Sequence, residues 1–278
     1  MNAADFGVAR NTDELGGTMR EAIEQIARSA GAMLLDAVEQ GITVHEKDGI
    51  GNFVTDCDEA VQRFLQRELK AVWPEAAFVG EEDGKDACRS QGACFIVDPI
   101  DGTTNFIRSL GSSVVSIGLV ENGVPKIGVV YNPFSGELFS AERGRGAALN
   151  GSPIHVSGRP LKNALVSFGM TSYQRDLTVR MFRTLQALFE HCEDFRSFGS
   201  AALDICRVAA GRLDAYLELR LHPWDYAGAS CILLEAGGRI TTAEGGTLPF
   251  DATASVLAAN GACYEEALAI CLNNADNA

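Results

Sequence analysis

The succession of hydrophobic patterns along the chain constrains the fold more than any other feature of the sequence. In the N-terminal third, Thr18 and Glu21 have the spacing of a helix capping box, and apolar residues then recur at helical intervals up to Gly41. A second helix is predicted over about residues 56–72. Between these helices, residues 44–55 are polar and predict a loop or a short hairpin.

From residue 95 onward the pattern becomes strand-like. Asn122-Gly123 is a strong hairpin signal between two β-prone runs, so an antiparallel meander is predicted. In the second half, helical and strand-like patterns alternate. Helices are expected over 177–189, 201–210, 226–235 and 265–272, and strands over 215–217, 240–241 and 256–258. This mixture predicts helices packed on sheets, in an α/β or layered α+β architecture.

The chain is expected to form one compact unit over residues 1–278. Its length suits one large domain or two closely joined ones, and no Pro- or Ser-rich linker separates the halves. We expect any division to fall into two intimately packed halves, over about 1–150 and 151–278.

Charge and composition exclude several classes of protein. The chain has 23 Lys+Arg against 37 Asp+Glu, a formal net charge of −14, which argues against a nucleic-acid-binding surface. An acidic N-terminus without an apolar core, and the absence of a long apolar run, predict a cytoplasmic protein with no membrane contact. The eight cysteines are scattered without a Cys-x-x-Cys pair, so we expect reduced, mostly buried thiols.

The chemistry concentrates in residues 95–106, where a strand delivers Asp98 and Asp101 into a turn that contains proline. Such a turn can aim both carboxylates and the Ile100 carbonyl at one point, a hard oxygen set suited to Mg²⁺. Gly102 removes side-chain bulk, and a helix beginning near Thr103 would present free N–H groups to an anion. The alternative, a turn that only caps a helix, does not explain two acids after a buried strand.

Two further acidic positions have a similar setting. Glu81 follows the apolar pair Phe78-Val79, and it could bind a metal and accept a proton from water, although an exposed Glu pair is more often a solvated turn. Asp225 stands at the expected start of a helix, where it could cap the helix or close a metal site from across the fold. No serine or cysteine nucleophile motif competes with these acids.

Together, these segments resemble the inositol monophosphatase family. The resemblance rests on Glu81 in Gly-Glu-Glu, on Asp98-Pro-Ile-Asp-Gly-Thr-Thr-Asn-Phe106 and on Trp224-Asp225-Tyr-Ala-Gly-Ala229, which occur in this order, with flanking matches over about residues 20–270. It implies an alternating five-layer αβαβα sandwich of the inositol monophosphatase and fructose-1,6-bisphosphatase type. It also implies a lithium-sensitive, Mg²⁺-dependent phosphomonoesterase that is commonly dimeric.

The resemblance further implies roles for individual residues. Two or three Mg²⁺ ions would be held by Glu81, Asp98, the Ile100 carbonyl, Asp101 and Asp225. Glu81 and Thr103 would orient and deprotonate the attacking water, with Asp58 polarising the Thr103 hydroxyl. The substrate would contact Asp101, Gly102, Thr103, Ser200, Ala201 and Glu218, and Lys47 would belong to a loop that completes the site.

The function predicted from the sequence is hydrolysis of a small polyol phosphate, with inositol monophosphate as the preferred substrate, by metal-activated water in a homodimeric enzyme. This reaction needs acceleration of up to roughly 10²¹-fold, and the dianion must be neutralised by cations before water can attack it. Fructose 1,6-bisphosphate, histidinol phosphate and 3′-phosphoadenosine 5′-phosphate stay open as substrates of the same chemistry. A regulatory partner of the transcription machinery and a structural Mg²⁺- or Ca²⁺-binding module stay open as other classes.

Overall fold

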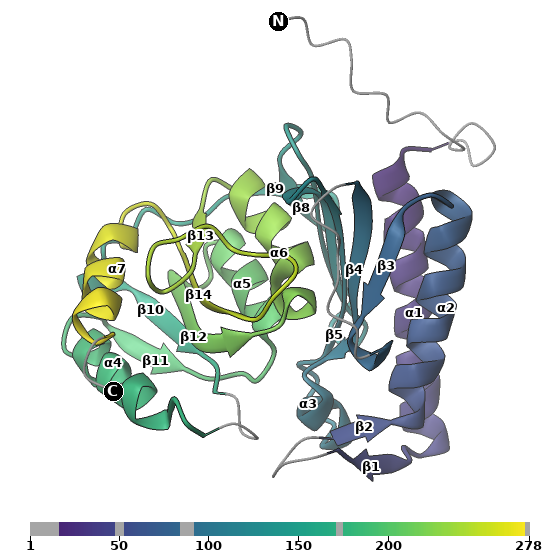
Figure 1. The fold of residues 1–278 in the computed structure, drawn as a ribbon, viewed down its shortest axis with the longest axis horizontal. Helices are drawn as coiled ribbons and strands as arrows, with labels where there is room; N and C mark the ends of the chain where they lie inside the picture. Colours follow the sequence, from purple (N-terminus) through teal and green to yellow (C-terminus); the bar gives the residue numbers. More distant parts are fainter. Residues whose placement is uncertain (1–16, 48–52, 84–91, 171–174, 276–278) are drawn as a thin grey trace, which may run out of the picture.

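Five layers of secondary structure make up the molecule, as the computed structural model shows (Figure 1). It describes residues 17–47, 53–83, 92–170 and 175–275. The helices are α1 Met19–Gln40, α2 Asp56–Val72, α3 Thr103–Ile107, α4 Thr178–Phe189, α5 Ala201–Ala209, α6 Pro223–Glu235 and α7 Tyr264–Asn273, with 3-10 turns η1 Glu81–Asp83 and η2 Leu161–Asn163. From right to left in Figure 1, helices α1 and α2, a first sheet, helices α5 and α6, a second sheet, and helices α4 and α7 follow one another. The five-layer αβαβα prediction is confirmed.

The first sheet has seven strands in sequence order. They are β3 Ala77–Gly80, β4 Ala93–Asp101, β5 Val114–Glu121, β6 Val124–Asn132, β7 Glu137–Glu142, β8 Ala147–Leu149 and β9 Ser152–Ile154. Only β3 and β4 are parallel, and the rest form the predicted antiparallel meander. Asn122 (φ 51°) and Gly123 (φ 73°) make the turn between β5 and β6, as their left-handed preference predicts.

The second sheet has five strands in the order β11-β10-β12-β14-β13. They are β10 Leu165–Phe168, β11 Asp194–Arg196, β12 Ala215–Leu221, β13 Arg239–Thr241 and β14 Ala254–Ala259. Strand β10 is parallel to β11 and β12, and β14 is antiparallel to β12 and β13. A separate small hairpin joins β1 Val44–Glu46 to β2 Phe53–Thr55, as one of the two alternatives for this segment predicted.

Helix α1 begins and ends where the sequence indicates. Thr18 and Glu21 form the predicted capping box, and Gly41 (φ 95°) ends the helix. In α2 the cap is Thr55, whose side chain accepts a bond from the backbone N–H of Asp58, so Asp58 occupies the N3 position. The buried faces of α1 and α2 pack on the first sheet in one apolar cluster that includes Ile23 and Leu65.

Helix α6 connects the two sheets because glycines let its backbone approach the first sheet closely. A Cβ on Gly128 of β6 would lie 2.1 Å from the carbonyl oxygen of Gly228, and one on Gly118 of β5 would lie 2.7 Å from the Gly228 nitrogen. Trp224 and Ile232 of the same helix are buried in the apolar cluster between the sheets. Helix α6 therefore has a fixed position relative to the strands beneath it.

The remaining predictions about composition agree with the described residues. Seven cysteines are free thiols, five of them buried, and Cys88 lies outside the described residues. None of the described helices combines the length and the apolar character that a bilayer crossing requires. The main omissions of the sequence analysis are the short strands β8 to β11, which have three or four residues each.

Candidate active site

Glu81 and Asp98 lie at the same edge of the first sheet because β3 and β4 are parallel. In this pair Gly80 stands opposite Val97, so the next residues along the two strands are Glu81 and Asp98. The Asp98 side chain is buried (2% exposed), and its Oδ1 accepts a 2.9 Å bond from the Ile100 backbone N–H. Glu81 begins the 3-10 turn η1 and is about one-quarter exposed, with 25% of its side chain accessible.

A bulge in β4 turns Asp98 and Asp101 toward the same region. In a regular strand, residues three positions apart point to opposite faces. Here Asp98 pairs with Ser116 and Asp101 pairs with Val114, so β4 contains one more residue than β5 between these pairs. An extra residue of this kind redirects side chains, and bulges are common beside active sites. The physical role of the proline-containing turn is therefore a bulge at the end of a buried strand.

Asp101 is held by the start of helix α5, which belongs to the second half of the chain. Its Oδ2 accepts bonds from the Ser200 hydroxyl (2.6 Å) and the Ala202 backbone N–H (2.8 Å). Ser200 is also the N-cap of α5, accepting from the Leu203 backbone N–H. The N-terminal end of a helix favours a negative charge, so α5 stabilises the Asp101 carboxylate. This contact joins the two halves at the site.

Gly102 and Thr103 form the turn between β4 and α3. Gly102 (φ 88°) adopts the left-handed conformation, and a Cβ there would lie 3.0 Å from the Gly199 carbonyl oxygen and 3.1 Å from the Ser112 carbonyl oxygen. Thr103 begins α3, and its hydroxyl donates a 3.2 Å bond to the Ile100 carbonyl. The first N–H groups of a helix have no acceptor within it, so this turn has the chemistry of a phosphate cradle.

Asp225 reaches the site from helix α6, but it does not cap that helix. The helix begins at Pro223, three residues before the predicted start, and its N-cap is His222. Asp225 occupies the N3 position, where its Oδ2 accepts a 2.7 Å bond from the His222 backbone N–H. The expectation of an N-cap aspartate was wrong because Pro223, which needs no N–H partner, starts the helix earlier.

The four acids raise one another's pKa values. Burial and the neighbouring carboxylates raise the pKa of Asp98 and of Asp225 well above the ordinary value. Burial raises the pKa of Glu81 to about 7, against the lowering effect of Lys47. Burial raises the pKa of Asp101 to about 6, although its bonds from Ser200 and Ala202 act in the opposite direction. Carboxylates that destabilise one another in this way lack a cation.

Asp58 and Lys47 lie beside this group with partners other than those expected. The Asp58 Oδ2 accepts bonds from the backbone N–H (2.7 Å) and the hydroxyl (2.5 Å) of Thr55, and its buried Oδ1 has no hydrogen-bond partner in the structure. Burial raises the pKa of Asp58 to about 6. Lys47 lies 2.8 Å from Glu82 and 3.5 Å from Glu81. The structure thus shows Thr103 bonded to Ile100 and Asp58 bonded to Thr55.

A cavity of about 210 Å³ opens beside these acids. The predicted site residues that line it are Glu81, Asp101, Gly102, Thr103, Ser200, Ala201, Glu218 and Asp225. Asp98 and Ile100 are buried beside Asp101 and do not line it. Glu218 of β12 is buried (7% exposed), and its Oε2 accepts a 2.6 Å bond from the Tyr216 hydroxyl.

The donor set fits Mg²⁺ in its chemistry. Carboxylate and carbonyl oxygens are the ligands that this ion prefers, and the raised pKa values show that positive charge would be favourable here. In the described part of the chain, no three or more His, Cys, Asp or Glu side chains stand in the arrangement of a metal-binding group. The fit therefore rests on the type and the electrostatics of the donors.

Several residues that position the site were not singled out in the sequence. The Asn105 amide donates to the carbonyl oxygens of Ser112 (2.9 Å) and Phe198 (2.6 Å), and it ties α3 to the segment before α5. The Ser113 hydroxyl donates to the Gly102 carbonyl (2.9 Å). Asp204 lines the cavity beside Arg207, and burial raises its pKa to about 7. Only the position of Asn105 inside the 98–106 segment was a signal.

Comparison with known proteins places this chain in a family. The profile of the inositol monophosphatase family matches residues 17–275, which is most of the chain. The chain belongs to the inositol monophosphatase family. An inositol-1-monophosphatase of Bacillus subtilis is 35% identical over 252 residues, covering 87% of this chain and 94% of that protein. The Nus factor SuhB of Vibrio cholerae is 36% identical over 223 residues, covering 80% of this chain and 84% of that protein.

Solved structures agree with this membership of the inositol monophosphatase family. An inositol monophosphatase of Thermotoga maritima is similar to this chain with a TM-score of 0.81 at 30% identity, over 94% of this chain and 98% of that one. A structure titled as SaIMPase-II with bound inositol monophosphate has a TM-score of 0.79 at 28% identity, over 91% of this chain and 93% of that one. The layered fold predicted from the sequence is the fold of these relatives.

Proposed function

We propose that this protein is a Mg²⁺-dependent phosphomonoesterase that hydrolyses a small polyol phosphate, with inositol monophosphate as the preferred substrate. The observation that carries the proposal is the meeting of four acids from two sheet strands and helix α6 beside the turn at Gly102 and Thr103. Acids alone would suit any cation site. A glycine turn into a helix start at the same cavity adds a place for a phosphate group.

In this proposal Mg²⁺ would be held by Glu81, Asp98, the Ile100 carbonyl, Asp101 and Asp225. When bound, the ion supplies positive charge that neutralises the phosphate dianion and acidifies a water molecule. Bulge geometry in β4 and the amide contacts from α5 hold the aspartates of the first half, and the short first turn of α6 holds Asp225.

The chain's own groups then bind the substrate and move the proton. The backbone N–H groups of Gly102 and Thr103 would bind phosphate oxygens. Glu81, whose pKa is raised to about 7, is suited to accept a proton from water near neutral pH. The Thr103 hydroxyl would orient that water, and it must leave its bond to Ile100 to do so.

The alcohol part of the substrate would lie over the far side of the cavity. Glu218 can accept bonds from substrate hydroxyls there, and its bond from Tyr216 fixes its orientation. Ser200 and Ala201, at the start of α5, line the same side. A structure titled as SaIMPase-II with bound 2′AMP keeps nucleotide phosphates among the alternative substrates. Fructose 1,6-bisphosphate, histidinol phosphate and 3′-phosphoadenosine 5′-phosphate are the others.

A phosphate-release assay tests this function. Inositol 1-phosphate and these alternatives are incubated with the purified protein, with and without Mg²⁺, and then with added Li⁺. We expect release that needs Mg²⁺, is fastest with inositol 1-phosphate and falls with Li⁺. If every compound stays intact in the presence of Mg²⁺, the enzymatic proposal is wrong.

A regulatory role is a second candidate, and the observation that favours it is the similarity to relatives named Nus factor SuhB. Those names belong to the relatives. For this chain the test is capture of transcription-machinery components by the immobilised protein, compared with capture by an Asp225→Asn variant. Binding that is equal for both proteins would show a role independent of the acidic site, and no binding would remove this candidate.

The proposal includes a cytoplasmic homodimer. Helix α4 supports an interface, because Val179, Phe182 and Phe189 are 60%, 58% and 57% exposed along one stripe of its surface. A second copy of the chain would cover such a face. Light scattering of the purified protein measures the mass directly, and a Phe182→Glu variant is expected to shift it from dimer to monomer.

A further inference from the structure

The cavity contains one basic side chain that the proposed mechanism does not use. Among the described residues that line it, five are acidic and Arg220 alone is basic. Four of these acids lie around the phosphate end or behind it, and Glu218 lies on β12 near Arg220. A cation at this place has no partner in the hydrolysis of a simple monophosphate, so its position calls for an explanation.

Strand β12 directs Arg220 into the cavity. Tyr216, Glu218 and Arg220 stand at alternate positions of the strand, and alternate residues share one face of a sheet. All three line the cavity. Between Glu218 and Leu221 the pairing with β14 shifts by one residue, which marks a bulge where side chains change direction. The strand thus presents a carboxylate and then a guanidinium to the same space.

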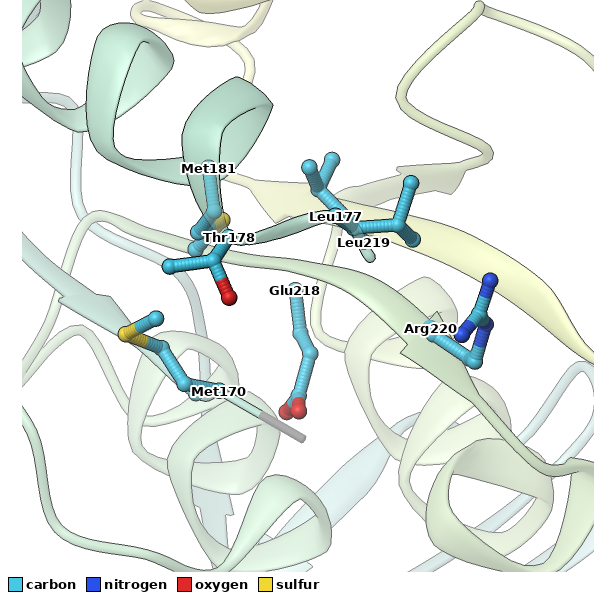
Figure 2. Close-up of a pocket in the computed structure, with 8 residues that line it drawn as sticks. Met170, Leu177, Thr178, Met181, Glu218, Leu219 and Arg220 are labelled. Carbon is cyan, nitrogen blue, oxygen red and sulfur yellow. The ribbon is translucent and has the colours of Figure 1, made fainter. Parts of the chain in front are cut away.

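A smaller pocket extends the cavity past Glu218 toward helix α4 (Figure 2). Gly169, Met170, Glu218 and Arg220 line both, so the two spaces adjoin. Figure 2 shows Glu218 between Met170 on one side and Arg220 on the other. There is therefore room beyond the alcohol-binding residue for a further substituent of the substrate.

Arg220 is already arranged to hold an oxyanion. Its Nη1 and Nη2 atoms donate to the two carboxylate oxygens of Asp176 at 2.7 Å and 2.8 Å. This fork-like pairing is the geometry in which arginine also binds phosphate. The Asp176 side chain is 61% exposed and that of Arg220 is 27% exposed, and an ion pair so accessible to water contributes little stability. A phosphate group can therefore replace Asp176.

We propose that Arg220 binds a second phosphate group of the substrate, in exchange for Asp176, and that the site prefers small polyol bisphosphates to the corresponding monophosphates. This inference rests on the proposed phosphomonoesterase function, and it refines the substrate class of that site. One phosphate occupies the turn at Gly102 beside the acids and is hydrolysed. The other stays bound to the guanidinium and positions the polyol between them.

The test compares fructose 1,6-bisphosphate with fructose 1-phosphate, two substrates that share the phosphate at C1. Values of kcat/KM are measured with Mg²⁺ for the wild-type protein and for Arg220→Gln, Asp176→Asn and Arg212→Gln. Arg212 is the matched control, because it forms an exposed ion pair with Glu137 and does not line the cavity. Thermal unfolding of each variant shows that it is folded.

We expect the ratio of kcat/KM for bisphosphate to that for monophosphate to fall about 10- to 100-fold in Arg220→Gln, because a bond between charged groups is lost. In Asp176→Asn the ratio should rise, because the competing carboxylate is gone. In Arg212→Gln it should stay as in the wild-type protein. A purely structural ion pair would instead make Arg220→Gln and Asp176→Asn change both substrates alike.

The two proposals fail in different ways. If the wild-type protein releases phosphate from neither compound, the phosphomonoesterase function fails. If it hydrolyses both but prefers fructose 1-phosphate, or if Arg220→Gln leaves the ratio unchanged, the function stands and the assignment of Arg220 is overturned.

Discussion

At the scale of single residues, Asp225 offers the clearest separation of catalysis from stability. An asparagine keeps a side-chain oxygen that can accept the bond from the His222 backbone N–H, so helix α6 should start as before. The negative charge, however, is lost. Removing one metal-binding carboxylate forfeits several kcal/mol of charge stabilisation, so we expect Asp225→Asn to lower turnover on the order of 10³-fold. Phosphate release at saturating Mg²⁺ measures it.

The same substitution should not destabilise the metal-free protein. Asp225 has a pKa well above its ordinary value because it is buried near other carboxylates, and an amide in its place removes that repulsion. The thermal midpoint without Mg²⁺ should therefore stay the same or rise. Asp36→Asn, at an exposed position of α1, is the control and should change neither quantity. Full activity in purified Asp225→Asn would contradict the assignment of this residue.

Gly102 allows a second residue-scale prediction, because it has a matched control in Gly136. Both have a left-handed φ (88° and 71°), but a Cβ on Gly136 would meet no atom within 4 Å. Gly136→Ala should thus cost only the conformational penalty of about 1–2 kcal/mol. Gly102→Ala should cost a further ~1–3 kcal/mol from crowding and should also reduce turnover. Urea unfolding of both variants measures the difference, and equal losses would show that the turn tolerates a side chain.

At the scale of elements, the position of α6 depends on glycines in the strands beneath it. A methyl group on Gly128 would lie 2.1 Å from the Gly228 carbonyl oxygen, so helix and strand must separate. We expect Gly128→Ala to destabilise the protein by about 1–3 kcal/mol and to weaken Mg²⁺ binding, because α6 carries Asp225. Gly261→Ala is the control, since its Cβ would meet open space at an unstrained φ. Chemical denaturation and Mg²⁺ titration check the two effects, and similar results for both variants would disprove the role of close packing.

Elements with strong local signals were predictable from the sequence, and those that depend on distant partners were not. The capping box of α1 and the turn at Asn122-Gly123 are local, and both form as predicted. Strands β10 and β11 have few residues and gain their stability from pairing with each other and with β12. The start of α6 was placed three residues too late because Asp225 is a common cap residue.

The candidate site shows the same division. The acidic segments near 81, 98 and 225 stood out in the sequence because each follows a strand or opens a helix. The bulge that turns Asp101 toward Asp98, and the bonds from Ser200 and Ala202 to Asp101, arise from tertiary contacts. The sequence could not reveal that Arg220 lines the same cavity, because that follows from the path of β12 between β10 and β14.

At the scale of the whole molecule, the buried acids connect stability to pH and to Mg²⁺. The pKa of Glu81 is raised from 4.5 to about 7 and that of Asp101 from 3.8 to about 6. Between these values the folded state binds more protons than the unfolded state, so the metal-free protein loses stability as pH rises from about 4 to about 7. It should unfold at a lower temperature at pH 8 than at pH 5.5, by about 2–4 °C for each kcal/mol.

Mg²⁺ should reverse this loss where the acids are ionised. Since the ion binds only the folded state and needs deprotonated carboxylates, it should raise the thermal midpoint strongly at pH 8 and weakly at pH 5.5. The net charge of −14 also lowers stability at high pH, but that effect is common to all variants. Asp225→Asn separates the two contributions, because it should flatten the pH dependence and reduce the Mg²⁺ response while changing the total charge by only one. A variant that kept the full response to both would show that the acids near Asp225 titrate independently of it, and the shared cation site would have to be abandoned.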